Sequence, residues 1–466
     1  MKYNKVTNDI LEEFRTILGS KNVLNNKEEL IPYSKDETSD ASALPEVVLK
    51  PNNTYDISRI MKIANENIIP VTPRGLGTGV SGGALPVKSG VVLSLEHFTK
   101  IIEVDRENMV AVVEPGVITG MLQKEVEKQG LFYPPDPASL DICSIGGNVA
   151  EGAGGPRAVK YGTTKDYLRG MEIVLPTGEI LSLGGKIHKD ATGYNIMGII
   201  AGSEGTLAVI TKIILKLLPL PRYRVDLLIP FKNFKEASLS IQKVFNTSIV
   251  PVNIEFIESK AINALKIYLK EDFPFPEAGA HLLIGLDGSS KKAIEKEYEE
   301  VGEVCLNMGA IDVFVADNPQ AKERLWKARR SLHDALEHRS RIMEREDVVV
   351  PVSRIPELLD FVYRLSEESG FEIVPFGHAG DGNVHINILK MDTPDDEWMK
   401  KKEGVVEELL KKVVSLGGTL SGEHGIGIVK KRFMHFAWSK EKIELAKRIK
   451  RAFDPNNILN PGKIFE

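Results

Sequence analysis

The stretch Pro73-Arg74-Gly75-Leu76-Gly77-Thr78-Gly79-Val80-Ser81-Gly82-Gly83 decides the architecture of the first part of the chain. Five glycines and two hydroxyl side chains in eleven residues suit a loop whose backbone N–H groups wrap a phosphate. A glycine-rich loop that binds no ligand is the alternative interpretation.

The context of this loop argues against a Rossmann fold. Gly77, Gly79 and Gly82 match the dinucleotide-binding pattern GxGxxG, but that pattern must open a helix. Here the loop leads into a predicted strand at 91–95 instead. A βαβ unit is predicted before the loop, with a strand at 46–50, a helix from Asn53 or Thr54 to Asn65 and a strand at 68–71.

Two further runs of small residues follow in the same part of the chain. They cover residues 144–157 and 202–211, and both would let a flat ligand approach the backbone closely. Beyond Pro219-Leu220-Pro221 glycine becomes scarcer, and strands alternate with amphipathic helices. That pattern predicts an antiparallel sheet with helices on one face, so the expected fold class is α+β.

The second part contains the segment Gly377-His378-Ala379-Gly380-Asp381-Gly382-Asn383-Val384-His385-Ile386-Asn387. Asp381-Gly382 favours a type I′ hairpin turn that would pair His378 with His385. One face of this hairpin would carry His378, Asn383, His385 and Asn387, and the other Val384, Ile386 and Ile388. An imidazole-rich face is typical of a metal or catalytic site, and a solvent-facing hairpin without function is the alternative.

Composition limits the classes of function. The chain has 466 residues, which suggests two or three domains, and a net charge of −5 with no basic cluster among aromatics argues against nucleic acid. The two cysteines, Cys143 and Cys305, are too few for an iron–sulfur cluster. A polar N-terminus and the lack of a run of about 18 apolar residues predict a cytoplasmic protein without a membrane span.

Several motifs, in this order, resemble those of FAD-linked oxidases with the p-cresol-methylhydroxylase-type fold. They are Arg74-Gly75-Leu76-Gly77-Thr78, Ser81-Gly82-Gly83, Ser144-Ile145-Gly146-Gly147-Asn148, Gly155-Pro156-Arg157, Tyr161-Gly162 and Gly202-Ser203-Glu204-Gly205-Thr206. Later motifs resemble the D-2-hydroxyacid dehydrogenase branch, which includes D-lactate dehydrogenases, the flavin subunit of glycolate oxidase and D-2-hydroxyglutarate dehydrogenases. These are Gly377 to His385, Glu423-His424-Gly425, Asp454-Pro455 and Asn460-Pro461-Gly462-Lys463.

The resemblance covers nearly the whole chain and implies an FAD-binding domain at 1–221, a substrate or cap domain at 222–420, and a C-terminal segment at 421–466 that returns to the FAD site. The residues it implies in FAD binding are Arg74, Gly75, Gly77, Thr78, Gly79, Ser81, Pro137, Ser144, Gly147, Asn148, Gly154, Tyr161, Glu204, Gly205 and Asn460. The loop from Arg74 to Ser81 would hold the pyrophosphate. Some relatives attach FAD to a histidine in this loop, and this chain has none there, so we expect non-covalent FAD.

Oxidation of a 2-hydroxy acid requires loss of the hydroxyl proton, transfer of the Cα hydride to flavin N5 and a partner for the carboxylate. His378, His385 and Glu423 offer two imidazoles and a carboxylate, a set suited to Fe(II), Zn or Mn. Such an ion would lower the pKa of the substrate hydroxyl, and His424 is the expected general base.

Arg329 matches the family's substrate arginine, so we expect it to bind the carboxylate and assist catalysis. An ordinary surface helix position is the alternative. Asn383 and Asn387 are further candidates for substrate contact, with packing on the strand face as the alternative. Asp381 is a candidate to orient a ligand imidazole, although its place in the turn would also explain it.

The electrons must leave the flavin again. The chain has no cysteine cluster and no nicotinamide site, so the expected acceptor is another protein, either an electron-transferring flavoprotein or an iron–sulfur subunit. D-lactate is the expected substrate, with glycolate and D-2-hydroxyglutarate as alternatives. A non-redox transferase like the alkyl-dihydroxyacetone-phosphate synthases, which share the flavin fold, is the alternative of another class.

Overall fold

The computed structural model describes residues 2–39, 41–271 and 273–465 and divides into two compact units. The first unit contains the chain up to Gly154, Thr163–Leu220 and the segment from Glu423 onward. The second contains Gly155–Gly162 and Pro221–Gly422. No helix in the described ranges is long and apolar enough to cross a membrane.

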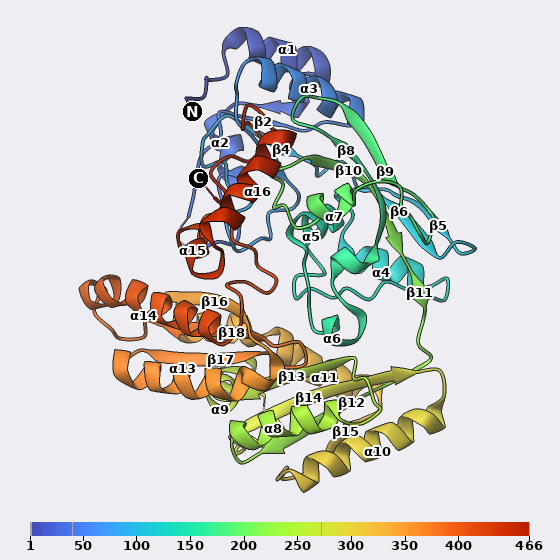
Figure 1. The fold of residues 1–466 in the computed structure, drawn as a ribbon, viewed down its shortest axis with the longest axis vertical. Helices are drawn as coiled ribbons and strands as arrows, with labels where there is room; N and C mark the ends of the chain where they lie inside the picture. The colour runs from blue at the N-terminus through green and yellow to red at the C-terminus, as the bar shows by residue number, and fades with distance from the viewer. Residues whose placement is uncertain (1, 40, 272, 466) are drawn as a thin grey trace. The chain divides into compact units, whose positions relative to one another are not determined.

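A four-stranded sheet opens the first unit. Its strands, in spatial order, are β1 (Val23–Leu24), β2 (Val47–Leu49), β4 (Val91–Ser94) and β3 (Val71–Arg74). β2 and β3 both run parallel to β4, while β1 is antiparallel to β2. Helices α1 (Asn8–Leu18) and α3 (Thr54–Glu66) lie over one face (Figure 1), because their apolar stripes share a core with alternate strand residues such as Leu49 and Leu93.

The structure fixes two boundaries of the predicted βαβ unit, the start of its helix and the start of its second strand. Helix α3 begins at Thr54, and the Asn53 side chain caps it by accepting a hydrogen bond from the Asp56 N–H. The strand predicted at 68–71 is wrong, since β3 begins only at Val71. Ile68 has a φ of +53° and therefore belongs to the turn that leaves α3.

The second sheet of this unit is antiparallel. Its strands, in spatial order, are β5 (Ile101–Asp105), β6 (Val110–Val113), β10 (Val209–Lys216), β8 (Leu168–Val174) and β9 (Ile180–Gly184). The unit also contains α4 (Thr119–Glu127), α5 (Ile145–Glu151) and α7 (Ile196–Ile200). The small-residue run at 144–157 thus starts as a helix, which the Ser144 hydroxyl caps by accepting from the Gly147 N–H.

The C-terminal segment is built into the first unit. Leu459 forms a parallel bridge with Val71 on β3, so it extends the edge of the first sheet. Helix α16 (Lys440–Phe453) precedes it and ends beside Asp454. The Asp454 carboxylate is fully buried and accepts from the Ile458 N–H at 3.0 Å, the Leu459 N–H at 2.8 Å and the Lys450 ammonium.

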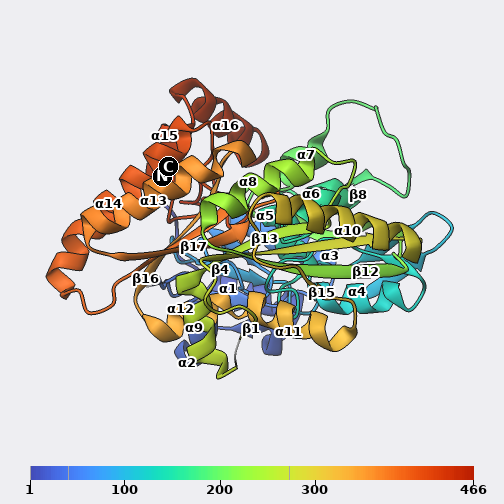
Figure 2. The ribbon, with the colours of Figure 1, turned by 90° about the horizontal axis from the view of Figure 1, so that it is seen from below.

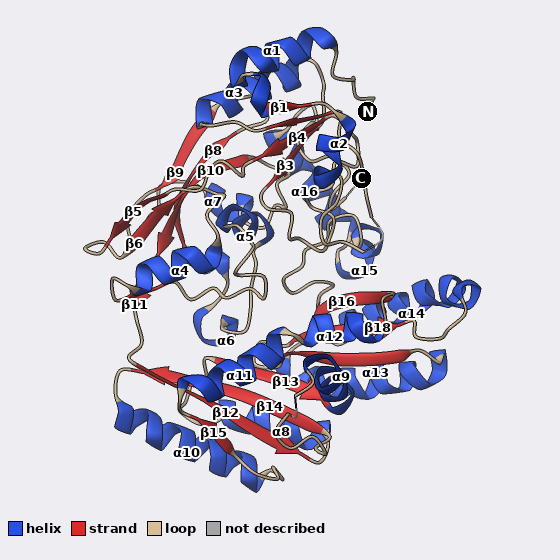
Figure 3. Ribbon diagram, turned by 180° about the vertical axis from the view of Figure 1, so that it is seen from behind, coloured by secondary structure: helices blue, strands red, loops and turns tan. Residues whose placement is uncertain are grey.

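The second unit is built on one antiparallel sheet. Its strands, in spatial order, are β15 (Phe314–Ala316), β12 (Tyr223–Phe231), β14 (Ala280–Gly288), β13 (Asn253–Glu258), β17 (Glu372–His378), β18 (Asn383–Leu389) and β16 (Met343–Val349). This confirms the predicted antiparallel sheet (Figure 3).

Helices pack on both faces of this sheet (Figure 2). One face carries α8 (Phe234–Phe245), α10 (Lys291–Asn307), α13 (Ile355–Ser369) and α14 (Asp395–Ser415). Part of the other face carries α9 (Ser259–Leu269), α11 (Pro319–Arg330) and α12 (Leu332–Arg339), which enclose a core with Val374 and Phe376. The sequence pattern predicted helices on one face alone. That part of the prediction is wrong, because α9, α11 and α12 pack on the other face.

The predicted hairpin exists, but its predicted register is wrong by two residues. His378 pairs with Asn383, and Phe376 pairs with His385, around a turn of residues 379–382. Gly382 has a φ of +87°, whereas Asp381 does not take the positive φ that a type I′ turn needs. A shift of two residues preserves the faces, so His378 and His385 still share one face, with their ring centroids 5.2 Å apart.

Replacing Asp454 by Ala should destabilise the first unit by about 3–5 kcal/mol, because it leaves the buried Lys450 ammonium without its anion. We expect the midpoint of urea unfolding to fall accordingly. Glu125→Ala removes an exposed partner of Lys128 in the same unit and should leave the midpoint unchanged. Equal midpoints for the Asp454 and Glu125 variants would contradict this account.

Glu258, at the end of β13, predicts a pH-dependent stability of the second unit. Burial raises the pKa of its carboxyl to about 7 from 4.5, against the opposing effects of Lys260 and the Tyr363 hydroxyl. Between these two values the folded chain holds a proton that the unfolded chain has lost. The free energy of unfolding must therefore fall as pH rises from 4.5 to 7.

Glu258→Gln should abolish this component, which amounts to about 3 kcal/mol at pH values above 7. The measurement is the urea midpoint of the variant relative to the natural chain between pH 4.5 and 8. The variant should gain relative stability as the pH rises. The exposed Glu367→Gln variant is the control, and a pH-independent difference for Glu258→Gln would refute the assignment.

Candidate active site

We call the side of β17 and β18 that carries His378, Asn383, His385 and Asn387 the imidazole face. A buried carboxylate on the next strand contacts it. Glu255 lies on β13 directly opposite His378 on β17, and its side chain is fully buried. Both carboxylate oxygens lie 2.8 Å from His378 Nδ1. Burial raises the pKa of Glu255, but His378 and Arg329 outweigh it, so the net direction is down and the carboxylate is ionised.

The contact fixes which nitrogen of His378 is available to a ligand. An Nδ1–H that donates to Glu255 leaves Nε2 as the nitrogen with a lone pair. Metal-binding histidines commonly donate their second ring N–H to a carboxylate in this way, which orients the ring. The donor set on this face therefore fits a divalent metal ion. Glu255 is a carboxylate that the sequence reasoning did not consider, and it contacts the Nδ1 of His378 directly.

Arg329, in the last turn of α11, binds the same carboxylate. Its Nε donates to Glu255 Oε2 at 2.7 Å, and its Nη2 lies 2.6 Å from that oxygen. The guanidinium also lies over the Phe376 ring, 5.1 Å from its centroid. Glu255 thus binds the side of the guanidinium formed by Nε and Nη2.

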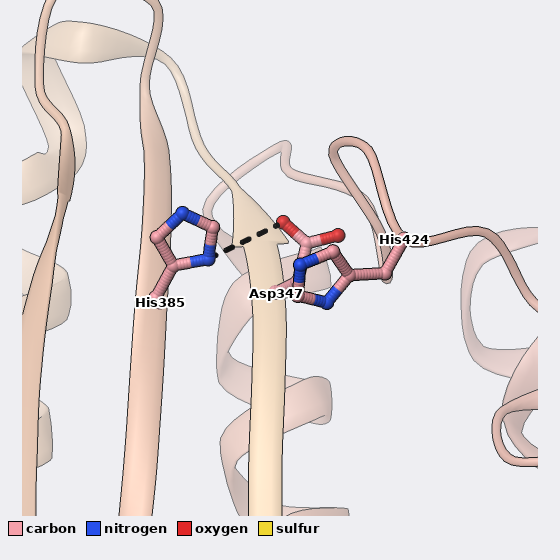
Figure 4. Close-up of side chains that lie close together, drawn as sticks. All are labelled: Asp347, His385 and His424. Atoms are coloured by element: carbon pink, nitrogen blue, oxygen red, sulfur yellow. Dashed lines mark ion pairs between the residues drawn. The ribbon is translucent and has the colours of Figure 1, made fainter. Parts of the chain in front are cut away.

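Asp347 organises the other half of this face. It is fully buried on β16 and pairs with His385 on β18, with Oδ1 and the His385 Nδ1 3.9 Å apart (Figure 4). Asp347 Oδ1 accepts from the Asn383 amide at 2.6 Å. Asp347 Oδ2 accepts from the Ser421 hydroxyl at 2.8 Å and from the Gly422 N–H at 3.0 Å.

The predicted residues Asn383 and Asn387 both lie on the imidazole face. The Asn383 amide nitrogen donates to Asp347 and to the Val348 carbonyl. The Asn387 amide nitrogen donates to the Val374 carbonyl at 3.2 Å. Both side chains therefore hold neighbouring strands together, whatever else they contact.

The first unit contains two of the small-residue runs and the run at 144–157 as far as Gly154. A Cβ added to Gly75 would lie 2.5 Å from the Ser144 hydroxyl, so the loop after β3 meets the start of α5. The Asn460 amide donates to the carbonyls of Gly83 at 2.9 Å and Glu204 at 2.8 Å, which ties the C-terminal segment to two of the runs. Gly205 faces the same amide.

Two buried side-chain donors in the loop after β3, from Arg74 to Ser81, fit a phosphate ligand. Within the described residues, Arg74 Nη1 and the Ser81 hydroxyl are buried and have no hydrogen-bond partner. Burial lowers the pKa of Arg74, and the nearby carboxylates Asp36 and Glu96 oppose this. A buried cation with an unused N–H group would be stabilised by an anion such as a pyrophosphate.

Three residues predicted to bind the cofactor have side chains that bind protein groups. The Asn148 amide donates to the Thr119 hydroxyl at 2.7 Å. Tyr161 belongs to the second unit, where its hydroxyl donates to Asp287 at 2.8 Å. The carboxylate oxygens of Glu204 accept from the N–H groups of Ile426 and Gly427 at 2.8 and 2.7 Å.

The remaining predicted cofactor residues, Gly77, Thr78, Gly79, Pro137, Gly147 and Gly154, also belong to the first unit. A Cβ on Gly154 would lie 3.1 Å from a carboxylate oxygen of Glu423, which places the proposed metal ligand beside the end of α5. His424 follows it in the same unit.

Glu255 and Asp347 were missed as functional residues. Glu255 lies in the apolar strand sequence Asn253-Ile254-Glu255-Phe256-Ile257. A charged residue within a buried strand is uncommon unless it is paired, and this was the signal available. Its partner Arg329 is 74 residues away, so no local pattern could have linked the two.

Two family models together match most of the chain. Residues 45–184 match the family model for an FAD binding domain, and residues 220–464 match the C-terminal domain of FAD linked oxidases. The chain is 40% identical to a D-lactate dehydrogenase of Anaerostipes hadrus over 99% of this chain and 98% of that one. It is 38% identical to the glycolate oxidase subunit GlcD of Bacillus subtilis, over 99% and 97% of the two chains.

Among solved structures, p-cresol methylhydroxylase has the same fold. The TM-score is 0.80 at 22% identity, over 98% of this chain and 96% of that one. An alkyldihydroxyacetonephosphate synthase gives a TM-score of 0.76 at 20% identity, over 99% and 87% of the two chains. At these identities the likeness describes the fold alone, so it confirms the p-cresol-methylhydroxylase-type architecture and says nothing of the reaction.

Glu255→Gln should weaken binding of a divalent metal by about 10–100-fold, because Gln cannot accept from His378 through two ionised oxygens. Isothermal titration of the metal-free protein with Zn(II) or Mn(II) measures this directly. Asp381→Asn is the matched control. Asp381 accepts from the Asn383 N–H within the turn, so its loss should change metal affinity much less. The reverse order of effects would assign the orienting role to Asp381.

Proposed function

Because the chain belongs to the FAD-linked oxidase family and is an FAD-dependent oxidoreductase, we propose that it oxidises a D-2-hydroxy acid, D-lactate first among them, to the 2-oxo acid. The observation that carries this proposal is the buried contact between Glu255 and His378, which prepares one imidazole nitrogen for a metal ion. Relatives named D-lactate dehydrogenase, at 40% identity, support the choice of substrate.

Bound FAD would supply the acceptor for the hydride that leaves the substrate Cα. The loop from Arg74 to Ser81 would hold its pyrophosphate, and its unused buried donors support that role. Ser144 and Gly147 at the start of α5, together with Gly205, would face the ring system. The loop contains no histidine, which supports non-covalent binding.

His378, His385 and Glu423 are the proposed metal ligands, for Fe(II), Zn or Mn. Bound there, the ion would supply a Lewis acid that makes the substrate hydroxyl more acidic. The first two ligands lie on neighbouring strands of one face. Glu423 follows Gly422 directly in the chain, and the Gly422 N–H donates to Asp347.

His424 is the proposed general base, taking the hydroxyl proton onto an imidazole nitrogen. It is adjacent in sequence to Glu423, a proposed metal ligand. The base would therefore lie next to a group that holds the ion, and the ion would lower the pKa of the substrate hydroxyl. Arg329 would hold the substrate carboxylate through Nη1, since its other edge is bound to Glu255. Asn383 and Asn387 are proposed as secondary substrate contacts.

A second protein is the proposed electron acceptor. The chain has two cysteines, which cannot hold an iron–sulfur cluster of its own. An electron-transferring flavoprotein or an iron–sulfur subunit would meet this need.

Anaerobic mixing of the purified yellow protein with D-lactate should bleach the flavin absorbance. Glycolate, D-2-hydroxyglutarate and L-lactate serve as comparison substrates, and the panel is run with Zn, Mn and Fe(II) in turn. Fastest bleaching by glycolate or D-2-hydroxyglutarate would change the substrate. No bleaching by any 2-hydroxy acid would refute the dehydrogenase and leave a transferase of the same fold as the better account.

His424→Ala should lower the bleaching rate at saturating D-lactate by about 10²–10⁴-fold, the usual contribution of a general base. The FAD content of the variant should stay unchanged. His435→Ala, at an exposed histidine whose ring contacts the Arg432 carbonyl, is the control and should retain the full rate. Full activity of His424→Ala would exclude it as the base.

A further inference from the structure

The proposed ligand and base lie on a short segment between two fixed points. The chain leaves the second unit at Gly422 and enters the first at Glu423, so Glu423 and His424 come directly after the crossing. The sequence here is Ser421-Gly422-Glu423-His424-Gly425-Ile426-Gly427, in which no residue belongs to a helix or strand. Such a segment has no regular hydrogen-bond ladder to hold its side chains in place.

On the side of the second unit, the segment is held by Asp347. Its Oδ2 accepts both the Ser421 hydroxyl and the Gly422 N–H, at 2.8 and 3.0 Å. Asp347 is fully buried, and β16 and the Asn383 amide fix its position. A bond from a backbone N–H to a carboxylate is charge-assisted and roughly twice as strong as a neutral one.

On the side of the first unit, the segment is held by Glu204. Its Oε1 and Oε2 accept the N–H groups of Ile426 and Gly427, at 2.8 and 2.7 Å. Glu204 itself has a φ of +52°, an unusual conformation for a residue with a side chain. Its own backbone is fixed, because its N–H donates to the Ala150 carbonyl and its carbonyl accepts from the Asn460 amide.

The glycines of the segment permit both attachments. A Cβ on Gly422 would lie 2.5 Å from the Asn383 amide nitrogen, and one on Gly425 would collide with Glu151. Gly425 and Gly427 also have φ angles of +82° and +49°. Each position therefore needs glycine for the chain to come close to its neighbours.

We propose that Asp347 and Glu204 are positioning residues that clamp the two ends of the crossing segment, Gly422 to Ile426, and thereby aim Glu423 and His424 at the substrate. Three residues, Glu423, His424 and Gly425, lie between the two attachment points. The two attachments fix the backbone on both sides of His424, so loss of either would change the orientation of its imidazole. This role rests on the proposed function, in which His424 is the base.

The clamps themselves can be tested without substrate or metal. Hydrogen exchange of the full chain, resolved to single amides by mass spectrometry, reports the two attachments separately. Asp347→Asn and the milder Ser421→Ala should speed exchange at the Gly422 amide about tenfold, as expected for the loss of one hydrogen bond. Glu204→Gln should do the same at Ile426 and Gly427. Unchanged exchange in these variants overturns the proposal.

The link to catalysis is tested by single-turnover bleaching with D-lactate. Ser421→Ala and Glu204→Gln should slow the rate per bound flavin at least tenfold, with the apparent Kd for substrate unchanged within about twofold. Ser366→Ala is the matched control, since its hydroxyl donates to the Phe371 carbonyl and accepts from the Ile373 N–H elsewhere in the second unit. It should leave both the rate and the exchange at Gly422 unchanged.

The outcomes separate this inference from the proposed function. If no 2-hydroxy acid bleaches the natural protein, the proposed function fails, and the exchange data still decide whether the clamps exist. If Glu204→Gln loses FAD without faster exchange at Ile426, Glu204 is a cofactor contact and the proposal is wrong. If amide exchange becomes faster but the bleaching rate per bound flavin stays normal, the attachments exist but do not position His424. That result would also overturn the proposal.

Discussion

A carboxylate with no solvent contact needs a counter-charge and hydrogen-bond donors, and on the imidazole face Glu255 has the Arg329 guanidinium and the His378 imidazole as partners. Three elements meet in this one interaction: β13 supplies the acid, β17 the histidine and α11 the arginine. The orientation of the His378 ring and the direction of the Arg329 guanidinium both follow from it. Without the acid, the arginine and the histidine would be two basic groups facing each other at 3.4 Å.

Some of the proposed site residues lie on strands or a helix, and others lie on irregular chain. The proposed ligands His378 and His385 and the proposed anchor Arg329 are set on strands or a helix, each by a buried carboxylate on a neighbouring strand. Glu423 and His424 lie on irregular chain and need carboxylates at both ends to define their place. Buried acids are thus used throughout to position other groups, and the groups that would touch substrate are mostly basic.

Local patterns in the sequence predicted the elements well wherever the deciding contact is local. The capping of α3 by Asn53 and the apolar side of the hairpin both depend on residues a few positions apart. The register of the hairpin could not be predicted from Asp381-Gly382, because the turn also uses the Asp381 side chain as an acceptor for the Asn383 N–H. The partners of Glu255 could not be predicted from local patterns, because they lie 74 and 123 residues away.

The resemblance to a known family supplied what local patterns could not, namely the cofactor and the residues expected to hold it. It did not indicate that Asn148, Tyr161 and Glu204 bind protein groups through their side chains. Those contacts depend on the exact packing of this chain, in which Tyr161 belongs to an eight-residue segment of the second unit, Gly155–Gly162. Family motifs identify positions that matter, and the structure is needed to say what each side chain touches.

The attachment of Leu459 to the edge of β3 bears on how the protein is made. A ribosome releases the chain from its N-terminal end, so the first sheet emerges long before the strand partner of Val71 exists. The second unit, apart from Gly155–Gly162, is one continuous stretch and can assemble while synthesis continues. The first unit can complete this sheet edge only after Leu459 has been synthesised, more than 380 residues after Val71. Until then the β3 edge lacks this partner, and an unpaired strand edge can pair with neighbouring chains.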